Sequence, residues 1–184
     1  MRGYFGIGVQ GISKAMNLGS VFRTAHAFGA SFVFTIGAAY DRSEGVYADT
    51  SDATQNMPYY EWPDLKSLVL PADCALVGVE LIDGAALLPS FRHPRAAAYV
   101  LGAERSSLSP ELLELCDHTI KIPTRFSVNL AIAGAIVMYD RLLSTGRFAE
   151  RPVSPGGSSE LPPPHMHGPP VWQRKERRRR RSKA

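Results

Sequence analysis

Residues 3–36 read GYFGIGVQGISKAMNLGSVFRTAHAFGASFVFTI, and this stretch decides the fold class. It opens on an apolar run at Tyr4–Val9 and closes on another at Ser31–Ile36, both short enough to be strands. Between them, apolar side chains recur at helical spacing over Leu18–Phe28, and Asn17 is the expected N-cap of this helix. A strand–helix–strand order predicts an α/β fold with a mostly parallel sheet.

The same alternation continues along the chain to about residue 143. Further strands are expected at Cys74–Leu81, Ala97–Leu101 and Thr119–Ile122, and further helices at Pro110–Leu115 and Leu130–Leu143, with a shorter helix at Asp64–Leu70. The segment Tyr59–Trp62 is an edge strand, loop packing or a surface on which RNA bases stack.

The helix expected at Leu130–Leu143 is apolar on almost every side. It is too short to span a bilayer, so we expect it to be buried within the fold and against a second subunit. Gly134 and the alanines around it would let another backbone approach closely.

Composition excludes several classes of protein. The 184 residues are 45% hydrophobic and 21% charged, as in an ordinary globular protein, and no apolar run is long enough to cross a membrane. There is no signal-peptide pattern at the N-terminus, and Cys74 and Cys116 form no CxxC pair, so we expect a cytoplasmic protein without a disulfide scaffold or zinc ribbon. His165 and His167 have no nearby partners for a metal, and no metal site is expected.

The excess of positive charge lies in the last 36 residues. The net charge is +4, yet residues 149–184 hold nine Lys and Arg against three Asp and Glu, together with seven of the 14 prolines. We therefore expect a folded domain over residues 1–148 and a disordered tail over residues 149–184. The basic run at 174–183 is either a solvated charge run or an arm that contacts RNA phosphates.

Residues Gly6–Gly11 match the G-x-G-x-x-G pattern of dinucleotide-binding proteins. The context argues against such a site, because the glycines lie inside the first expected strand and no carboxylate stands about 20 residues further on. We expect these glycines to permit close strand packing or a bend.

Three separated segments carry polar residues suited to catalysis. They are Asn17–Ala30 with Arg23, then Val100–Glu104 leading to Leu108–Glu111, and finally Ile120–Pro123 followed by Ser127–Ala131. Taken one at a time, each segment also fits a helix cap, a turn or a helix start. In this order and spacing they resemble the three motifs of the SpoU (TrmH) family of RNA ribose 2′-O-methyltransferases, over roughly residues 3–143.

The resemblance implies a fold, a cofactor and partners. It implies the SPOUT α/β-knot fold, in which the C-terminal segment threads through a loop as a trefoil knot, although knots are rare among proteins. It implies S-adenosyl-L-methionine as methyl donor, a ribose 2′-hydroxyl in tRNA or rRNA as acceptor, and a homodimer in which both subunits contribute to the site.

The resemblance also assigns roles to residues. Arg23 would hold the target phosphate and stabilise the developing alkoxide, because a guanidinium stays protonated, and the general base would be a substrate phosphate, a water or Arg23 with an unusually low pKa. Asn17 would position the nucleotide, Glu104 would fix the neighbouring backbone or Arg23, and Ser127 and Asn129 would orient the hydroxyl. The cofactor would lie against Leu101, Gly102, Ala103, Ile122, Pro123, Val128 and Leu130.

Two departures from the family pattern concern the cofactor pocket. Ser107 stands where the second motif usually has glycine, and the link Pro123–Ser127 is short and has no glycine. Two other functions remain open: a knotted RNA-binding or ribosome-assembly module without turnover, and an RNA methyltransferase of the same fold that acts on a base.

Overall fold

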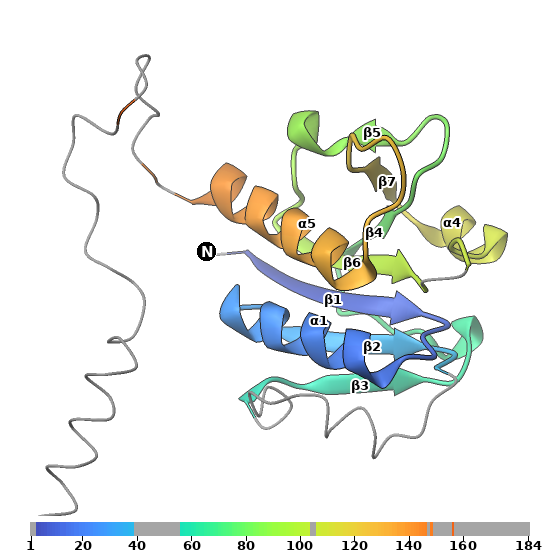
Figure 1. Ribbon diagram of the computed structural model, residues 1–184. Helices are drawn as coiled ribbons and strands as arrows, with labels where there is room; N and C mark the ends of the chain where they lie inside the picture. The colour runs from blue at the N-terminus through green and yellow to red at the C-terminus, as the bar shows by residue number, and fades with distance from the viewer. Residues whose placement is uncertain (1–2, 39–55, 104–105, 147, 149–155, 157–184) are drawn as a thin grey trace, which may run out of the picture. The chain divides into compact units, whose positions relative to one another are not determined.

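A computed structural model describes residues 3–38, 56–103, 106–146, 148 and 156. Figure 1 shows a sheet with helices on its faces. The strands are β1 Tyr4–Gln10, β2 Phe32–Ile36, β3 Tyr59–Trp62, β4 Ala75–Val79, β5 Ala86–Leu87, β6 Ala96–Gly102 and β7 His118–Lys121. The helices are α1 Ala15–Ala27, α4 Pro110–Leu115 and α5 Leu130–Thr145, with 3-10 turns η1 Leu65–Ser67 and η2 Leu88–Ser90.

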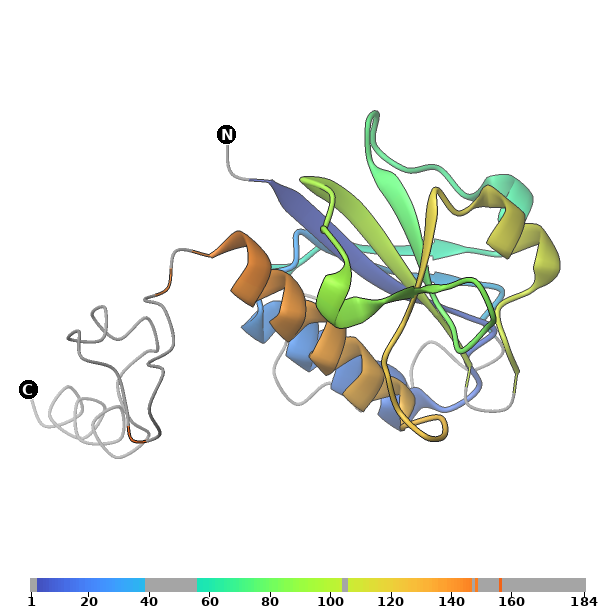
Figure 2. The same ribbon diagram turned by 90° about the horizontal axis from the view of Figure 1, so that it is seen from above.

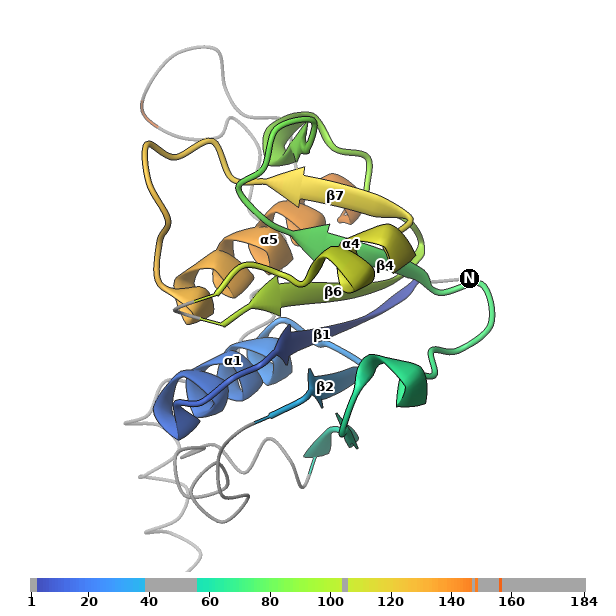
Figure 3. The same ribbon diagram turned by 90° about the vertical axis from the view of Figure 1, so that its right-hand side faces the viewer.

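The seven strands form one sheet in the order β3-β2-β1-β6-β4-β7-β5, and every pairing between them is parallel. Helices α1 and α5 lie side by side on one face, and α4 and η1 lie on the other (Figures 2 and 3). The predicted α/β fold with a parallel sheet is therefore confirmed. Tyr59–Trp62 is an edge strand, as one of its alternative interpretations held.

The first strand is buried on both faces, as parallel strands between helices are. Its side chains Phe5, Ile7 and Val9 pack beneath α1 and α5. On its other face, a Cβ added at Gly6 would lie 2.2 Å from the Phe32 ring, and one at Gly8 would lie 2.3 Å from the Phe34 ring. The glycines therefore make room for aromatic rings of β2, which confirms the strand-packing interpretation of the G-x-G-x-x-G match.

Helix α1 begins earlier than the sequence predicts. Its N-cap is Lys14, whose carbonyl accepts hydrogen bonds from Asn17 N at 3.1 Å and Leu18 N at 3.3 Å. The prediction of Asn17 as N-cap is therefore wrong, because Asn17 already lies within the first turn. The predicted apolar stripe is correct, since Leu18, Val21, Phe22 and Ala25 are all buried.

The short helix expected at Asp64–Leu70 is only the 3-10 turn η1. Asp64 accepts a hydrogen bond from Ser67 N, the Ser67 hydroxyl bonds back to the Asp64 backbone, and Leu68 is already extended. This local capping pair closes a single turn, so the helix does not propagate.

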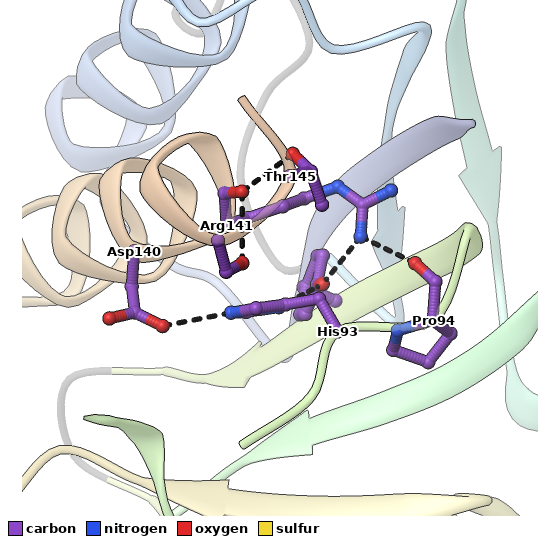
Figure 4. A network of polar contacts seen from close by, with 7 residues as sticks. His93, Pro94, Asp140, Arg141 and Thr145 are labelled. Carbon is purple, nitrogen blue, oxygen red and sulfur yellow. Dashed lines mark hydrogen bonds and ion pairs between the residues drawn. The ribbon is translucent and has the colours of Figure 1, made fainter. Parts of the chain in front are cut away.

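Helix α5 carries a buried arginine at its C-terminal end. Arg141 is 5% exposed, and its guanidinium donates to the carbonyl of Pro94 at 2.6 Å (Figure 4). It also donates to the carbonyls of Arg95 at 2.8 Å and Tyr4 at 3.3 Å. It also donates to Tyr99 Oη at 3.1 Å and lies 5.3 Å from the centre of the Phe5 ring. The side chain thus joins α5 to the first residues of β1 and to the chain that enters β6.

A buried histidine extends this network. His93 Nδ1 lies 2.6 Å from Tyr99 Oη, and His93 Nε2 lies 2.9 Å from Asp140 Oδ2. Tyr99 Oη accepts from Arg141 and can donate its own proton to His93 Nδ1; in that tautomer His93 Nε2 donates to Asp140. Burial lowers the pKa of His93, against the opposing effect of Asp140.

Gly134 faces the sheet. It is buried, and a Cβ added there would lie 3.3 Å from Ile7 Cδ1 of β1. The small residue therefore brings α5 close to the sheet of its own chain.

Candidate functional site

A cavity of about 620 Å³ opens where β4, β6 and β7 end. Ligands bind at the carboxyl ends of parallel strands in open α/β sheets, so this position is the expected one for a site. The cavity is lined by Lys14, Asn17, Val79, Glu80, Leu81, Leu101, Gly102, Ala103, Ser106, Ser107, Lys121, Ile122, Thr124, Ser127, Val128, Asn129, Leu130 and Ala133.

The first turns of α1 and α5 meet at this cavity. Asn129 caps α5, because its Oδ1 accepts a hydrogen bond from Ala131 N at 2.9 Å. Its Nδ2 donates to Asn17 Oδ1 at 3.4 Å, across 112 residues of sequence. One asparagine pair therefore links the first and third sequence segments, and both side chains line the cavity.

The chain that follows β7 forms another wall. The Ile122 carbonyl accepts from Thr124 N at 2.7 Å, so this chain turns sharply after the strand. Lys121 Nζ donates to the Ile82 carbonyl at 3.1 Å, which ties β7 to the segment after β4. Ser127 is exposed and Val128 is half-buried, and both line the cavity before α5 begins.

Gly102 is the point where β6 turns away from the sheet. A Cβ added there would lie 2.8 Å from the Ser106 carbonyl oxygen and 3.1 Å from Leu108 N. The chain after β6 folds back over Gly102, so this position has no room for a side chain. Gly102, which the resemblance places against the cofactor, is therefore also required by the fold itself.

The structure gathers most of the predicted site residues around the cavity. These are Asn17, Leu101, Gly102, Ala103, Ile122, Ser127, Val128, Asn129 and Leu130. Pro123 and Arg23 are not among the lining residues, and Arg23 lies on the exposed side of α1. Glu104 lies outside the described residues.

Sequence reasoning missed several lining residues. The most informative are Glu80, which follows β4, and Lys14, which precedes α1. Glu80 stands at the end of a predicted strand, so the rule that parallel strands present their carboxyl ends to the ligand would have found it. Lys14 was missed because the helix start was placed too late.

Other candidate features stand apart from the cavity. Burial raises the pKa of the Cys116 thiol to about 11, and its Sγ donates to the Leu112 carbonyl, so Cys116 has the character of a packing residue. Within the described ranges, no group of three or more His, Cys, Asp or Glu side chains could hold a metal ion. No helix in the described part of the chain is long and apolar enough to cross a membrane. His165 and His167 lie outside the described residues.

Comparison with known proteins identifies the family. A model of the SpoU rRNA methylase family matches residues 5–139, which includes all three motif segments. The chain belongs to the SpoU rRNA methylase family. The resemblance found in the three motifs is thereby confirmed. The cavity described above is the part of this SpoU chain where residues of all three motifs meet.

Two curated relatives are similar to this chain in sequence. The chain is 29% identical over 142 residues to the 23S rRNA (guanosine-2′-O-)-methyltransferase RlmB of Bordetella pertussis, covering 72% of this chain and 56% of the relative. It is 28% identical over 138 residues to the tRNA (guanosine(18)-2′-O)-methyltransferase TARBP1 of Mus musculus, covering 70% of this chain and 9% of the relative. The chain thus spans about half the length of the bacterial relative and a small part of the mouse one.

Solved structures share the fold. The SpoU methyltransferase AviRb from Streptomyces viridochromogenes, in complex with the cofactor AdoMet, superposes with a TM-score of 0.69 at 22% identity, covering 80% of this chain and 60% of that one. An AdoMet-bound rRNA methyltransferase from Sinorhizobium meliloti gives a TM-score of 0.69 at 21% identity, covering 78% of this chain and 57% of that one. At these identities the likeness establishes the fold.

Proposed function

We propose that this protein is an S-adenosylmethionine-dependent methyltransferase that modifies a ribose 2′-hydroxyl in tRNA or rRNA. The observation that carries the proposal is the cavity at the strand ends. Asn17 of the first motif and Ser127 and Asn129 of the third motif line it together, in a chain of the SpoU family. The two curated relatives described above are named as guanosine 2′-O-methyltransferases of rRNA and tRNA.

The cavity fits the proposed cofactor. Its volume of about 620 Å³ lies within the range of small-molecule sites. Its wall combines apolar side chains with the strand-end backbone of β6 and β7, which suits an adenine ring that needs an apolar slot and backbone hydrogen bonds. The residues that would hold it are Leu101, Gly102, Ala103, Ile122, Val128 and Leu130, with Pro123 beside them. The cofactor supplies an electrophilic methyl group on a sulfonium centre.

The chain's own residues would orient the acceptor. A ribose hydroxyl is a weak nucleophile at neutral pH and needs both positioning and help to lose its proton. Asn17, Ser127 and Asn129 provide amide and hydroxyl groups on the cavity wall. Arg23 would hold an RNA phosphate and stabilise negative charge on the ribose oxygen, and Glu104 would fix the neighbouring backbone or Arg23.

We infer a homodimer in which Arg23 serves the partner's cavity. Arg23 is exposed on α1 and does not line the cavity of its own chain. Ile132 and Tyr139, seven residues apart on α5, are 54% and 50% exposed, which supports an apolar contact between two copies through the C-terminal helix. We also infer the trefoil knot, which is supported by the packing of α5 against η2 and by the Arg141 bonds to Pro94 and Arg95.

A mixing experiment tests the shared site. Arg23→Ala and Asn129→Ala are each expected to abolish turnover while leaving a folded dimer. If the two residues serve one site from different subunits, exchange of the two inactive variants restores about a quarter of wild-type turnover, because half of the dimers regain one complete site. No recovery in exchanged dimers, verified by tagged copurification, would place both residues on one subunit and contradict the shared site.

The tail is proposed to add RNA affinity. Residues 149–184 carry a net charge of +6, which favours contact with phosphates. Deletion of this segment is expected to weaken RNA binding and to flatten its salt dependence, with cofactor binding unchanged. Equal RNA affinity in the shortened chain would refute this part of the proposal.

The decisive measurement is methyl transfer from labelled S-adenosylmethionine to small RNA and ribosomal RNA, followed by digestion to nucleosides. Label in a 2′-O-methylnucleoside supports the proposal and names the target base. Label on a base would move the activity to a base-directed methyltransferase. Cofactor binding without any transfer would favour an RNA-binding or ribosome-assembly module.

A further inference from the structure

The described part of the connection that follows β6, residues 106–109, is contacted by side chains from the two strands that flank β6. In the sheet, β6 stands between β1 and β4. Gln10 of β1 pairs with Gly102, and Val79 of β4 pairs with Leu101, so Gln10 and Glu80 lie level with Gly102 on either side. Both side chains can therefore reach the chain as it leaves the sheet.

Glu80 binds the connection from the β4 side. Its Oε2 accepts a hydrogen bond from Leu108 N at 2.8 Å, and its Oε1 accepts from Leu81 N at 3.0 Å. Both oxygens of the half-buried carboxylate are thus used on backbone N–H groups. Hydrogen bonds to an ionised acceptor are stronger than those between neutral groups.

Gln10 binds the connection from the β1 side. Its Oε1 accepts from Ser109 N at 2.8 Å, and its Nε2 donates to Ser109 Oγ at 3.0 Å. Ser109 Oγ in turn accepts from Leu112 N and caps α4. Glu80 lines the cavity, whereas Gln10 is not among the lining residues.

The connection held in this way is a wall of the cavity. Ser106 and Ser107 line it, and the Ser106 carbonyl lies where a Cβ of residue 102 would have to be. Ser107 replaces the glycine usual in the second motif, and the following residue, Leu108, is the one that Glu80 holds. The two side chains therefore fix the position of the segment whose sequence departs from the family pattern.

We propose that Gln10 and Glu80 are positioning residues that clamp residues 106–109 from two strands and thereby set the affinity of the cavity for S-adenosylmethionine. The inference rests on the proposed function, since it concerns the same cavity. Gln10 acts on the cofactor only through the connection, because its side chain bonds to Ser109 and does not line the cavity.

The test uses the full chain and side chains of matched length. Gln10→Met and Glu80→Met remove the hydrogen-bond acceptors while keeping the length of the side chain. The matched control is Asp117→Leu, because Asp117 Oδ2 accepts from Leu76 N at 2.8 Å at the opposite end of β4, away from the cavity. Dissociation constants for S-adenosylmethionine are measured by calorimetry, beside melting temperatures of the ligand-free proteins.

Each of the two clamp variants is expected to weaken binding about tenfold, as the loss of one well-formed hydrogen-bonded anchor implies. Asp117→Leu is expected to lower the melting temperature without changing the dissociation constant. Gln10→Glu keeps the acceptor for Ser109 N and is expected to retain wild-type affinity.

Three results would overturn the clamp. They are unchanged affinity in both variants, an effect confined to Glu80→Met, which would mean direct ligand contact, and an equal effect of Asp117→Leu, which would mean general loosening. Wild-type protein is titrated first. A folded wild type that does not bind S-adenosylmethionine overturns the proposed function together with the clamp, whereas wild-type binding with unaltered variants overturns the clamp alone.

Discussion

Replacement of Arg141 by methionine is expected to destabilise the folded unit by about 3–5 kcal/mol. Methionine keeps most of the length and apolar surface of the side chain but provides no donor. The carbonyls of Tyr4, Pro94 and Arg95 then lose the guanidinium that bonds to them at 2.6–3.3 Å, and Tyr99 Oη loses a donor as well. Each buried acceptor left without a partner costs about 1–3 kcal/mol, and water reaching the edge of the sheet recovers part of that cost.

The loss is measurable by urea unfolding followed by circular dichroism. For a unit of this size, 1 kcal/mol corresponds to about 2–4 °C, so the melting temperature is expected to fall by about 6–20 °C. Arg92, which is exposed, provides the control, since Arg92→Met should change stability by less than about 0.5 kcal/mol. Arg141→Lys keeps the charge but cannot reach all the acceptors, so its loss of stability should lie between those of Arg141→Met and Arg92→Met. An Arg141→Met protein within about 1 kcal/mol of wild type, with an unchanged m-value, would refute the reasoning.

Three further predictions follow from the pKa shifts and the packing. Burial lowers the pKa of His93, so the unfolded chain binds a proton that the folded chain excludes. Stability should therefore decline as pH falls below the ordinary pKa of 6.5. The variant His93→Gln should reduce the pH dependence of the urea midpoint between pH 5 and pH 7.5. Burial raises the pKa of Cys116 to about 11 from 9.0, so stability should decline above pH 9, and alkylation by iodoacetamide at pH 8 should be slow until urea unfolds the chain; rapid labelling of the native protein would contradict this. Gly102→Ala puts a Cβ 2.8 Å from the Ser106 carbonyl and should weaken S-adenosylmethionine binding at least about tenfold in a folded protein, which calorimetry can measure.

The fold class could be predicted from local sequence patterns. Because helices cover both faces of the sheet, its strands appear in the sequence as short apolar runs. The apolar runs at Tyr4–Val9 and Ser31–Ile36 and the stripe on α1 are features that neighbouring residues determine. The start of α1 at Ala15 was not predictable from a favourable cap, because the Lys14 carbonyl, not a side chain, begins the helix. The two-residue strand β5 is too short for any periodicity to reveal.

The candidate site could be predicted only in part from the sequence. Asn17, Ser127 and Asn129 were found because their motifs have a recognisable spacing, and the cavity brings them together. Glu80 was not found, because its carboxylate acquires its role from Leu108 N, 28 residues further along the chain. Arg141 was counted within an apolar helix, since its partners lie 46, 47 and 137 residues away and only the tertiary structure brings them to it.

The position of Arg141 also bears on the order in which the folded unit is completed during synthesis. Its partner carbonyls belong to residues made much earlier, at the start of β1 and before β6, whereas Arg141 lies four residues before the end of α5. A nascent chain can pair β1, β2 and β6 before α5 has left the ribosome, yet the amino ends of β1 and β6 then lack the Arg141 guanidinium. Arg141 is therefore synthesised near the end of the folded unit. Until then, the carbonyls at the amino ends of β1 and β6 are open to solvent or to a chaperone.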